Sequence, residues 1–186
     1  MAAMVRPALG LSVRPPSRRS TLAAPSADRL ADVTACPGAD TCQLGITSSR
    51  GLATAIGEIF QNGHAPAADA AGIRIKISGC PNSCGQHHVG DIGLTGHSVK
   101  TEDGTERPFY SILVGGSVGE GRARVGRRSG LFREEEAPIA IAAVARTFES
   151  ERSTGETFAA FVDRAGAPRL TELARGAVAA RRTAGA

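Results

Sequence analysis

Four cysteines, arranged as two close pairs, are the feature that most constrains what this chain can fold into. The first pair is Cys36-Pro-Gly-Ala-Asp-Thr-Cys42, the second is Cys80-Pro-Asn-Ser-Cys84, and no other cysteine occurs. A C-x5-C pair followed at long range by a C-x3-C pair can supply four thiolates to one inorganic centre. The spacing therefore predicts a protein that holds a metal cofactor.

Three kinds of site could use these cysteines. Disulfides are allowed by the count, but nothing else in the sequence indicates a secreted chain. A structural zinc site usually has pairs separated by two to four residues, which is closer than the first pair here. A [4Fe–4S] cluster takes four thiolates and is larger than a zinc ion. The spacing favours the cluster, with zinc or disulfides as the alternatives.

Composition and charge limit the remaining function classes. The chain has 186 residues, of which 41% are hydrophobic and only 4% aromatic, so its core must consist mainly of Ala, Val, Ile and Leu. Residues 1–34 contain five arginines and two aspartates, and residues 175–186 contain three arginines and no acid. The body between them is therefore slightly acidic, which argues against nucleic-acid binding. No apolar run is long enough to span a membrane.

The chain is expected to contain one folded domain with a leader and a tail. Residues 1–30 should form a disordered basic leader, whose composition also suits an organelle transit peptide. Residues 31–168 should form the domain, and residues 169–186 a C-terminal helix with a basic tail. Iron–sulfur chemistry needs a reducing compartment, so a cytoplasmic location is expected, with a plastid as the alternative.

Periodicity predicts an α+β fold in which a small mixed sheet is flanked by helices. A first helix, capped by Asp40 or Thr41, should run from about Leu44 to Phe60. Pro81 should begin a short helix that places Cys80 and Cys84 on one face. Strands are expected at 73–77, 91–95 and 108–115, and a hairpin turn at 101–104 should join the last two. Residues 115–130 should be a loop. The later helices are expected at 137–152, 155–165 and 170–181.

Several segments resemble the nitrite and sulfite reductase family. They are the two cysteine motifs, from Thr34 to Cys42 and from Gly79 to Gly93, together with the downstream segments 108–116 and 155–161. The resemblance covers about residues 33–166. It implies the 4Fe–4S domain-like fold of that family, as the second half of a duplicated structure.

The resemblance also implies a [4Fe–4S] cluster coupled to sirohaem, for the multi-electron reduction of nitrite to ammonia or sulfite to sulfide. In this family all four motif cysteines ligate the cluster, here Cys36, Cys42, Cys80 and Cys84. Cys84 would also bridge to the sirohaem iron, and Asn82 would lie against the macrocycle. The implied electron donor is ferredoxin or a flavoprotein.

The chain matches only the second half of these enzymes. Much of the basic cage around the substrate comes from the first half in this family, so the catalytic residues cannot be named here. The missing half is expected as a separate chain or a lost segment. The alternatives are a stand-alone iron–sulfur electron-transfer module and an inactive fragment, both without sirohaem.

Charged and histidine residues outside the cysteine motifs give weaker indications. An arginine-rich loop could neutralise sirohaem carboxylates, receive an acidic donor, or simply be solvated and balanced by Glu134–Glu136. Its arginines are Arg122, Arg124, Arg127, Arg128 and Arg133. His87 and His88 are expected to pack or hydrogen-bond near the cluster. Arg50 and Lys76 are expected at the surface.

Overall fold

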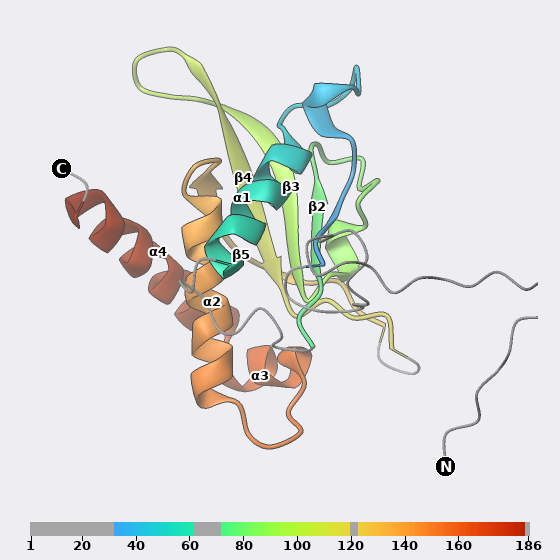
Figure 1. The fold of residues 1–186 in the computed structure, drawn as a ribbon, viewed down its shortest axis with the longest axis vertical. Helices are drawn as coiled ribbons and strands as arrows, with labels where there is room; N and C mark the ends of the chain where they lie inside the picture. The colour runs from blue at the N-terminus through green and yellow to red at the C-terminus, as the bar shows by residue number, and fades with distance from the viewer. Residues whose placement is uncertain (1–31, 62–71, 120–122, 185–186) are drawn as a thin grey trace, which may run out of the picture.

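A five-stranded mixed sheet forms the centre of the molecule (Figure 1). The computed structural model describes residues 32–61, 72–119 and 123–184. The strands are β1 (Thr34–Ala35), β2 (Ile75–Ser78), β3 (Ile92–Lys100), β4 (Glu106–Val114) and β5 (Arg127–Arg133). They lie in the sheet in chain order, with β1, β2 and β3 parallel and β3, β4 and β5 antiparallel.

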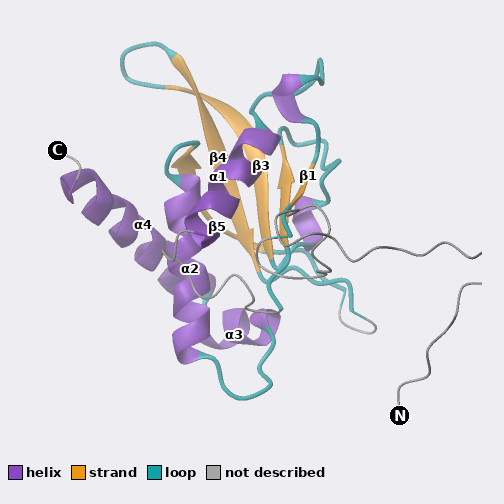
Figure 2. Ribbon diagram, viewed as in Figure 1, coloured by secondary structure: helices purple, strands orange, loops and turns teal. Residues whose placement is uncertain are grey.

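Helices are gathered on one side of this sheet (Figure 2). They are α1 (Ser49–Gln61), α2 (Ala137–Glu151), α3 (Phe158–Ala165) and α4 (Ala167–Ala184). Two short 3-10 helices, η2 (Gly38–Asp40) and η3 (His87–Val89), lie in the loops that follow β1 and β2. This arrangement confirms the predicted α+β fold with a small mixed sheet.

The core lies between the sheet and the helices. Ile92 and Leu94 on β3 pair with Val114 and Ile112 on β4, and all four side chains are almost completely buried. Alternate residues of a strand point to the same face, so these four form one apolar surface of the sheet. Small aliphatic residues of α2, such as Ile141, complete this core. The core is thus mainly aliphatic, as the low aromatic content predicted.

The hairpin between β3 and β4 confirms the prediction for residues 101–104. The Thr101 amide donates to the Thr105 carbonyl oxygen at 2.8 Å, and Gly104 adopts φ +80°. Both strands are longer than the alternation indicated, because β3 extends to Lys100 and β4 begins at Glu106. Figure 1 shows this hairpin projecting away from the body of the molecule.

The first helix begins later than predicted. Residues 41–48 form turns and bends, and α1 begins only at Ser49. The Ser48 hydroxyl accepts a hydrogen bond from the Gly51 amide at 3.2 Å, so Ser48 caps the helix instead of Asp40 or Thr41. Leu44 and Ile46 suggested an apolar helical face, but they are 68% and 42% exposed.

The loop predicted for residues 115–130 is only partly a loop. Its last residues belong to β5, which pairs antiparallel with β4 and contains an irregularity opposite Ile112 and Leu113. Beyond Gly115 and Gly116 the antiparallel pairing resumes as an isolated bridge between Ser117 and Arg124. Strand pairing therefore overrides the high glycine and arginine content of this segment.

Helix α4 runs from Ala167 to Ala184, beyond both ends of the predicted 170–181 helix. Its buried side chains include Leu170, Ala174 and Val178. The Arg182 Nε atom donates to Glu136, just before α2, at 2.8 Å.

The boundary expected at residue 168 stays a prediction, and the leader expected at residues 1–30 lies outside the described residues. In the part of the chain that the structure describes, no helix is long and apolar enough to span a membrane.

Candidate metal centre

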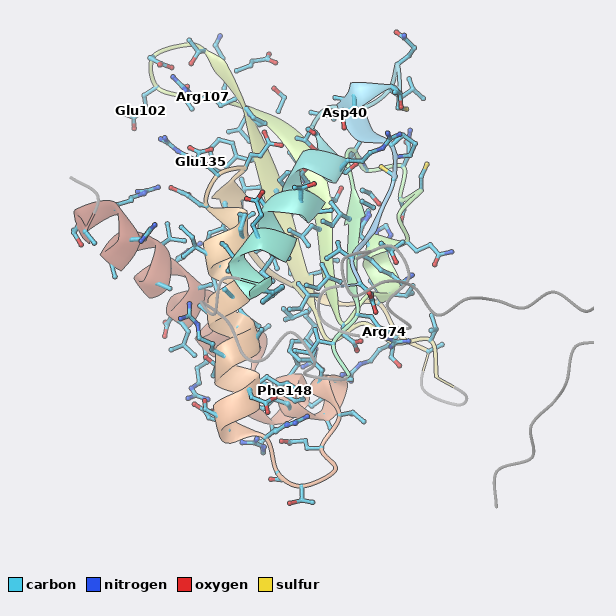
Figure 3. All side chains as sticks on the ribbon, viewed as in Figure 1. Asp40, Arg74, Glu102, Arg107, Glu135 and Phe148 are labelled. Carbon is cyan, nitrogen blue, oxygen red and sulfur yellow. The ribbon has the colours of Figure 1, made fainter. Side chains whose placement is uncertain are left out.

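The two cysteine segments follow adjacent parallel strands. Cys36 comes directly after β1, and Cys80 comes two residues after the last residue of β2. Ala35 on β1 pairs with Ile77 on β2. Because neighbouring parallel strands end at the same edge of a sheet, both segments emerge there together. The sulfur atoms, yellow in Figure 3, lie toward the end of the sheet where Asp40 is labelled, whereas Arg74, before β2, lies near the opposite end of the sheet.

Gly79 joins the two cysteine segments through backbone hydrogen bonds. Its amide donates to the Sγ atom of Cys36 at 3.2 Å. Its carbonyl oxygen accepts from the amides of Ile46 and Thr47 at 2.9 Å and 3.0 Å. The loop that carries Cys36 and Cys42 is therefore fastened to the residue immediately before Cys80.

The two segments pack backbone against backbone at this point. A Cβ atom on Gly79 would lie 2.7 Å from the Thr47 carbonyl oxygen and 2.9 Å from the Gly38 Cα atom. Both separations are shorter than a carbon atom tolerates, so any side chain here would push the loops apart. Gly38 itself adopts φ +65°, which glycine allows without strain.

Hydrogen bonds favour the thiolate form of Cys36. Burial acts to raise the pKa of this thiol, but hydrogen bonds from Ser49 and from the Gly79 amide outweigh it, so the pKa is lowered. The Ser49 hydroxyl has one hydrogen, which it donates either to the Cys36 carbonyl oxygen at 2.6 Å or to Sγ at 3.4 Å. Thiolates are the form that binds metal, so this environment prepares Cys36 to be a ligand.

The four cysteines suit an inorganic cofactor by their chemistry and exposure. All four are free thiols; Cys80 is buried, Cys36 is half-buried, and Cys42 and Cys84 are exposed. Soft sulfur donors of this kind select iron–sulfur clusters or zinc. Among the described residues, no three Cys, His, Asp or Glu side chains form a group that could hold a metal ion. The four cysteines therefore fit a metal cofactor through their sulfur donor atoms and through the hydrogen bonds that join their two loops.

The segment between Cys80 and Cys84 is a series of turns, which corrects the prediction of a short helix. Ser83 adopts φ +62° and Gln86 φ +56°, and neither value occurs in a right-handed helix. The Gly85 amide donates to the Ser78 hydroxyl at 3.1 Å, so the segment folds back on β2. Cys80 and Cys84 consequently do not share a helical face, and Asn82, like Cys84, is exposed.

The two histidines that follow this turn differ in their surroundings. His87 is 2% exposed, and burial, then the charges of His88 and His97, lower its pKa to about 4. His88 is exposed, and its Nδ1 atom lies 2.9 Å from the Ser83 hydroxyl. The two rings are in contact, with centroids 4.0 Å apart. Their predicted role beside a cluster stays a prediction.

The arginines expected to crowd one loop are distributed between β5 and the bridge that precedes it. Arg124 and Arg127 both pair with Asp163 of α3, at 2.6 Å and 2.9 Å. Arg133 lies 3.9 Å from Glu135. Arg128 instead donates from Nε to the Ser111 hydroxyl at 2.9 Å. Arg122 lies outside the described residues.

The two surface cations near the cysteine loops have polar partners. Arg50 donates to the Thr41 hydroxyl at 3.3 Å, and Lys76 donates to the Gln86 side-chain oxygen at 3.1 Å. Both hydrogen bonds are exposed to solvent, in agreement with the surface position predicted for these two residues.

Sequence reasoning missed two groups around this site. One is Ser49, which contacts Cys36; a serine at a helix start gives no sign of a thiol partner thirteen positions earlier. The other is a set of polar residues on the sheet face away from the helices, Thr95, His97 and Ser111. Thr95 and His97 are two residues apart on β3, and Ser111 lies opposite Thr95 on β4. This alternation along the strands was the sequence signal that could have revealed a shared polar face.

A separate cavity of about 660 Å³ lies at the end of the sheet away from the cysteines. It contains the ion pair between Arg74 and Asp91, at 2.8 Å, and the side chain of Phe158. None of the four cysteines lines it. This cavity is therefore not part of the candidate metal centre.

Comparison with known proteins gives the same family as the cysteine motifs. The chain is 33% identical over 163 residues to sulfite reductase [ferredoxin] 1 of Mycolicibacterium paratuberculosis, which covers 85% of this chain and 27% of that protein. It is 29% identical over 138 residues to the assimilatory ferredoxin-dependent nitrite reductase of Haloferax mediterranei, covering 74% of this chain and 23% of that protein. The chain thus spans about a quarter of the length of these relatives.

The fold agrees with a solved structure. The NirA protein of Mycobacterium tuberculosis superposes with a TM-score of 0.62 and 28% sequence identity, over 73% of this chain and 26% of that chain. The family model described as the nitrite and sulphite reductase 4Fe-4S domain matches residues 26–180, which includes both cysteine pairs. This match supports an iron–sulfur cluster as the cofactor. The chain belongs to the nitrite and sulphite reductase 4Fe-4S domain family.

Proposed function

We propose that this chain is the cluster- and sirohaem-binding part of a nitrite or sulfite reductase. The family match and the names of its relatives support the reaction class. The single observation that carries the proposal is the joining of the two cysteine segments at Gly79, whose amide and carbonyl group both hydrogen-bond to the segment that carries Cys36 and Cys42.

The proposed cluster ligands are Cys36, Cys42, Cys80 and Cys84. Cys36 and Cys80 would hold the inner side, because they are the two less exposed thiols and lie beside Gly79. Cys42 and Cys84 are exposed and would reach the outer side. The Gly79 amide, and the Ser49 hydroxyl whenever its hydrogen points to the sulfur, would stabilise the negative charge of Cys36 and tune the bound group.

Cys84 is the proposed bridge to sirohaem, and Asn82 the proposed contact with the macrocycle. Both lie on the exposed outer side of the turn, where a flat tetrapyrrole has access. When bound, a cluster coupled to sirohaem would pass electrons one at a time from an external donor to nitrite or sulfite. This chain's own part is to hold both groups in contact through one rigid turn.

The rest of the active site is proposed to come from outside this chain. An anionic substrate needs compensating cations in a site protected from water. Arg124 and Arg127 are already paired with Asp163, so they do not supply that cage. We propose that a first half of the reductase supplies it. The relatives' names point to ferredoxin as the donor, and a reducing compartment, cytoplasm or plastid, suits the thiols.

Anaerobic reconstitution with iron, sulfide and sirohaem tests this proposal. The wild-type chain should bind iron and show both the cluster absorption and the Soret band of sirohaem. Cys84→Ser should lose both, because it removes the shared thiolate. Iron analysis and visible spectra are the measurements.

Ser83→Gly is the matched control in the same turn. Glycine suits the φ of +62° at this position and leaves every cysteine in place, so both chromophores should remain. A wild-type chain that stays colourless and iron-free contradicts the whole proposal. If Cys84→Ser keeps full sirohaem binding, the bridge is wrong although the cluster assignment can stand. A cluster without any sirohaem would favour an electron-transfer module.

A further inference from the structure

The sheet face away from the helices carries a polar cavity beside the second cysteine segment. Its volume is about 250 Å³. Thr95 and His97 come from β3, Ser111 from β4 and Arg128 from β5, while the loop after β2 contributes Pro81 and His87. We call this set of six residues the polar sheet pocket. It is distinct from the four thiols, although Pro81 directly follows Cys80.

Three buried polar atoms of this pocket have no hydrogen-bond partner among the described residues. They are Nδ1 of His87, Oγ1 of Thr95 and Nε2 of His97. His87 is 2% exposed and Thr95 is 7% exposed. A buried polar atom without a partner destabilises a fold, so three around one cavity indicate a missing polar partner.

The polar sheet pocket contains the positive charge of Arg128 and, among the described residues, no negatively charged side chain. Arg128 donates from Nε to the Ser111 hydroxyl at 2.9 Å, and within the described residues it forms no ion pair. The next residue along the strand, Arg127, is paired with Asp163. Burial, followed by the charge of Arg128, lowers the pKa of His97. No carboxylate lines the pocket, so nothing in the described chain balances the guanidinium there.

We propose that the polar sheet pocket binds one oxyanion group, either a carboxylate or an inorganic oxyanion. The guanidinium of Arg128 supplies planar N–H donors, and the imidazoles and the Thr95 hydroxyl supply neutral ones. Such donors match the oxygens of an oxyanion, and the charged one gives the stronger bond. The volume is several times the roughly 30 Å³ of a water molecule, so an oxyanion fits with some water.

This oxyanion has two sources that the chemistry alone does not separate. One is a free inorganic anion. The other is a carboxylate on a larger group, such as the periphery of a tetrapyrrole held at Cys84; that source alone rests on the function proposed above. The pocket itself is argued without the cluster, so either proposal can fail while the other stands.

Histidine side-chain NMR of the cluster-free 186-residue chain tests the pocket. Sodium sulfate and sodium acetate are titrated separately, with sodium chloride keeping the ionic strength constant. The imidazole signals of His87 and His97 should shift and reach saturation with at least one of the two anions. In Arg128→Gln the apparent affinity should fall about tenfold or more, because a charge-assisted hydrogen bond is lost.

Arg127→Gln is the matched control, since it removes an equal charge from the adjacent residue that faces Asp163. It should bind the anion like the wild type. Arg128→Lys keeps the charge without the planar fork and should lose less affinity than Arg128→Gln, which separates binding from misfolding. Shifts that never saturate, or that are equal in Arg128→Gln and the wild type, overturn the proposal.

Isothermal titration calorimetry of the sirohaem-loaded chain with sulfate and acetate then separates the two sources, because paramagnetic iron would broaden the imidazole NMR signals whether or not the pocket is filled. If loading abolishes the sulfate and acetate responses, a tetrapyrrole carboxylate occupies the pocket. If the responses persist after loading, the pocket takes a free anion. Both results require the saturable binding described above.

Discussion

At the scale of single residues, the four thiols differ in their exposure and contacts. Cys36 has a sulfur that contacts Ser49 and the Gly79 amide, whereas Cys84 lies exposed on a turn. Motif spacing predicted which thiols belong to one site, because the types and distances of the cysteines are visible in the sequence. It could not reveal Ser49, since that contact depends on β1 and the start of α1 being adjacent.

Ser49→Ala should raise the pKa of the Cys36 thiol, because it removes a hydroxyl that can turn from the Cys36 carbonyl oxygen to donate to the thiolate. It should also cost about 1 kcal/mol of stability, since the Cys36 carbonyl oxygen loses its donor. The measurement is the pH dependence of Cys36 alkylation in cluster-free protein, resolved by mass spectrometry of peptides.

Ser48→Ala is the control for this thiol. Ser48 contacts Asp40 and the Gly51 amide, so its removal weakens the helix cap and should leave the alkylation profile unchanged. An unchanged profile in Ser49→Ala as well would show that this hydroxyl does not act on the sulfur.

At the scale of elements, the strands with apolar alternation were predictable and β5 was not. The β3–β4 hairpin has alternating apolar residues and a turn with Gly104, both of which are local signals. In contrast, β5 reads Arg-Arg-Ser-Gly-Leu-Phe-Arg and contains the irregularity opposite Ile112. Its pairing with β4 fixes it as a strand, and such tertiary pairing leaves no periodic pattern in the sequence.

A pair of glycine substitutions tests how elements and turns constrain the site. Gly57→Ala in α1 should raise stability by about 0.5–1 kcal/mol, because a Cβ there meets no atom within 4 Å. Gly85→Ala should lower it by about 1–3 kcal/mol, because its Cβ would overlap the Ile77 carbonyl oxygen. Urea unfolding of the cluster-free chain measures both changes.

The amount of iron bound after reconstitution should also differ between Gly57→Ala and Gly85→Ala. Gly57→Ala should reconstitute like the wild type, while Gly85→Ala should bind less iron because the turn that carries Cys84 must move. Equal iron content in the two variants would mean that the turn adapts without displacing the thiol.

At the scale of the whole molecule, α4 is an integral part of the core. Its residue Thr171 lies 3.1 Å from Ser129 of β5 through their hydroxyl groups, and Leu170 is completely buried. The family match also extends to residue 180. The periodic signal for this helix is weak, because α4 has many alanines and several charged residues, so its apolar face contrasts little with the rest.

Two leucines of α4 provide a matched test of this packing. Leu170→Ala should cost about 2–5 kcal/mol, because it removes a buried side chain and leaves a cavity. Leu173→Ala should cost about 1 kcal/mol or less, because this side chain is 38% exposed. Urea unfolding with far-UV circular dichroism measures the difference. Equal losses would show that α4 is not packed as described and that residues 169–186 are a separate tail.

Because β1 is short, we expect the two cysteine pairs to bind the cluster one after the other. This strand has two residues and, among the described residues, pairs only with β2, whereas β2 is paired on both sides. Local opening begins at the least supported segments, so the segment with Cys36 and Cys42 should detach while Cys80 and Cys84 remain in place. Iron and sulfide would then meet the second thiol pair first, and the first pair would close over the growing cluster last.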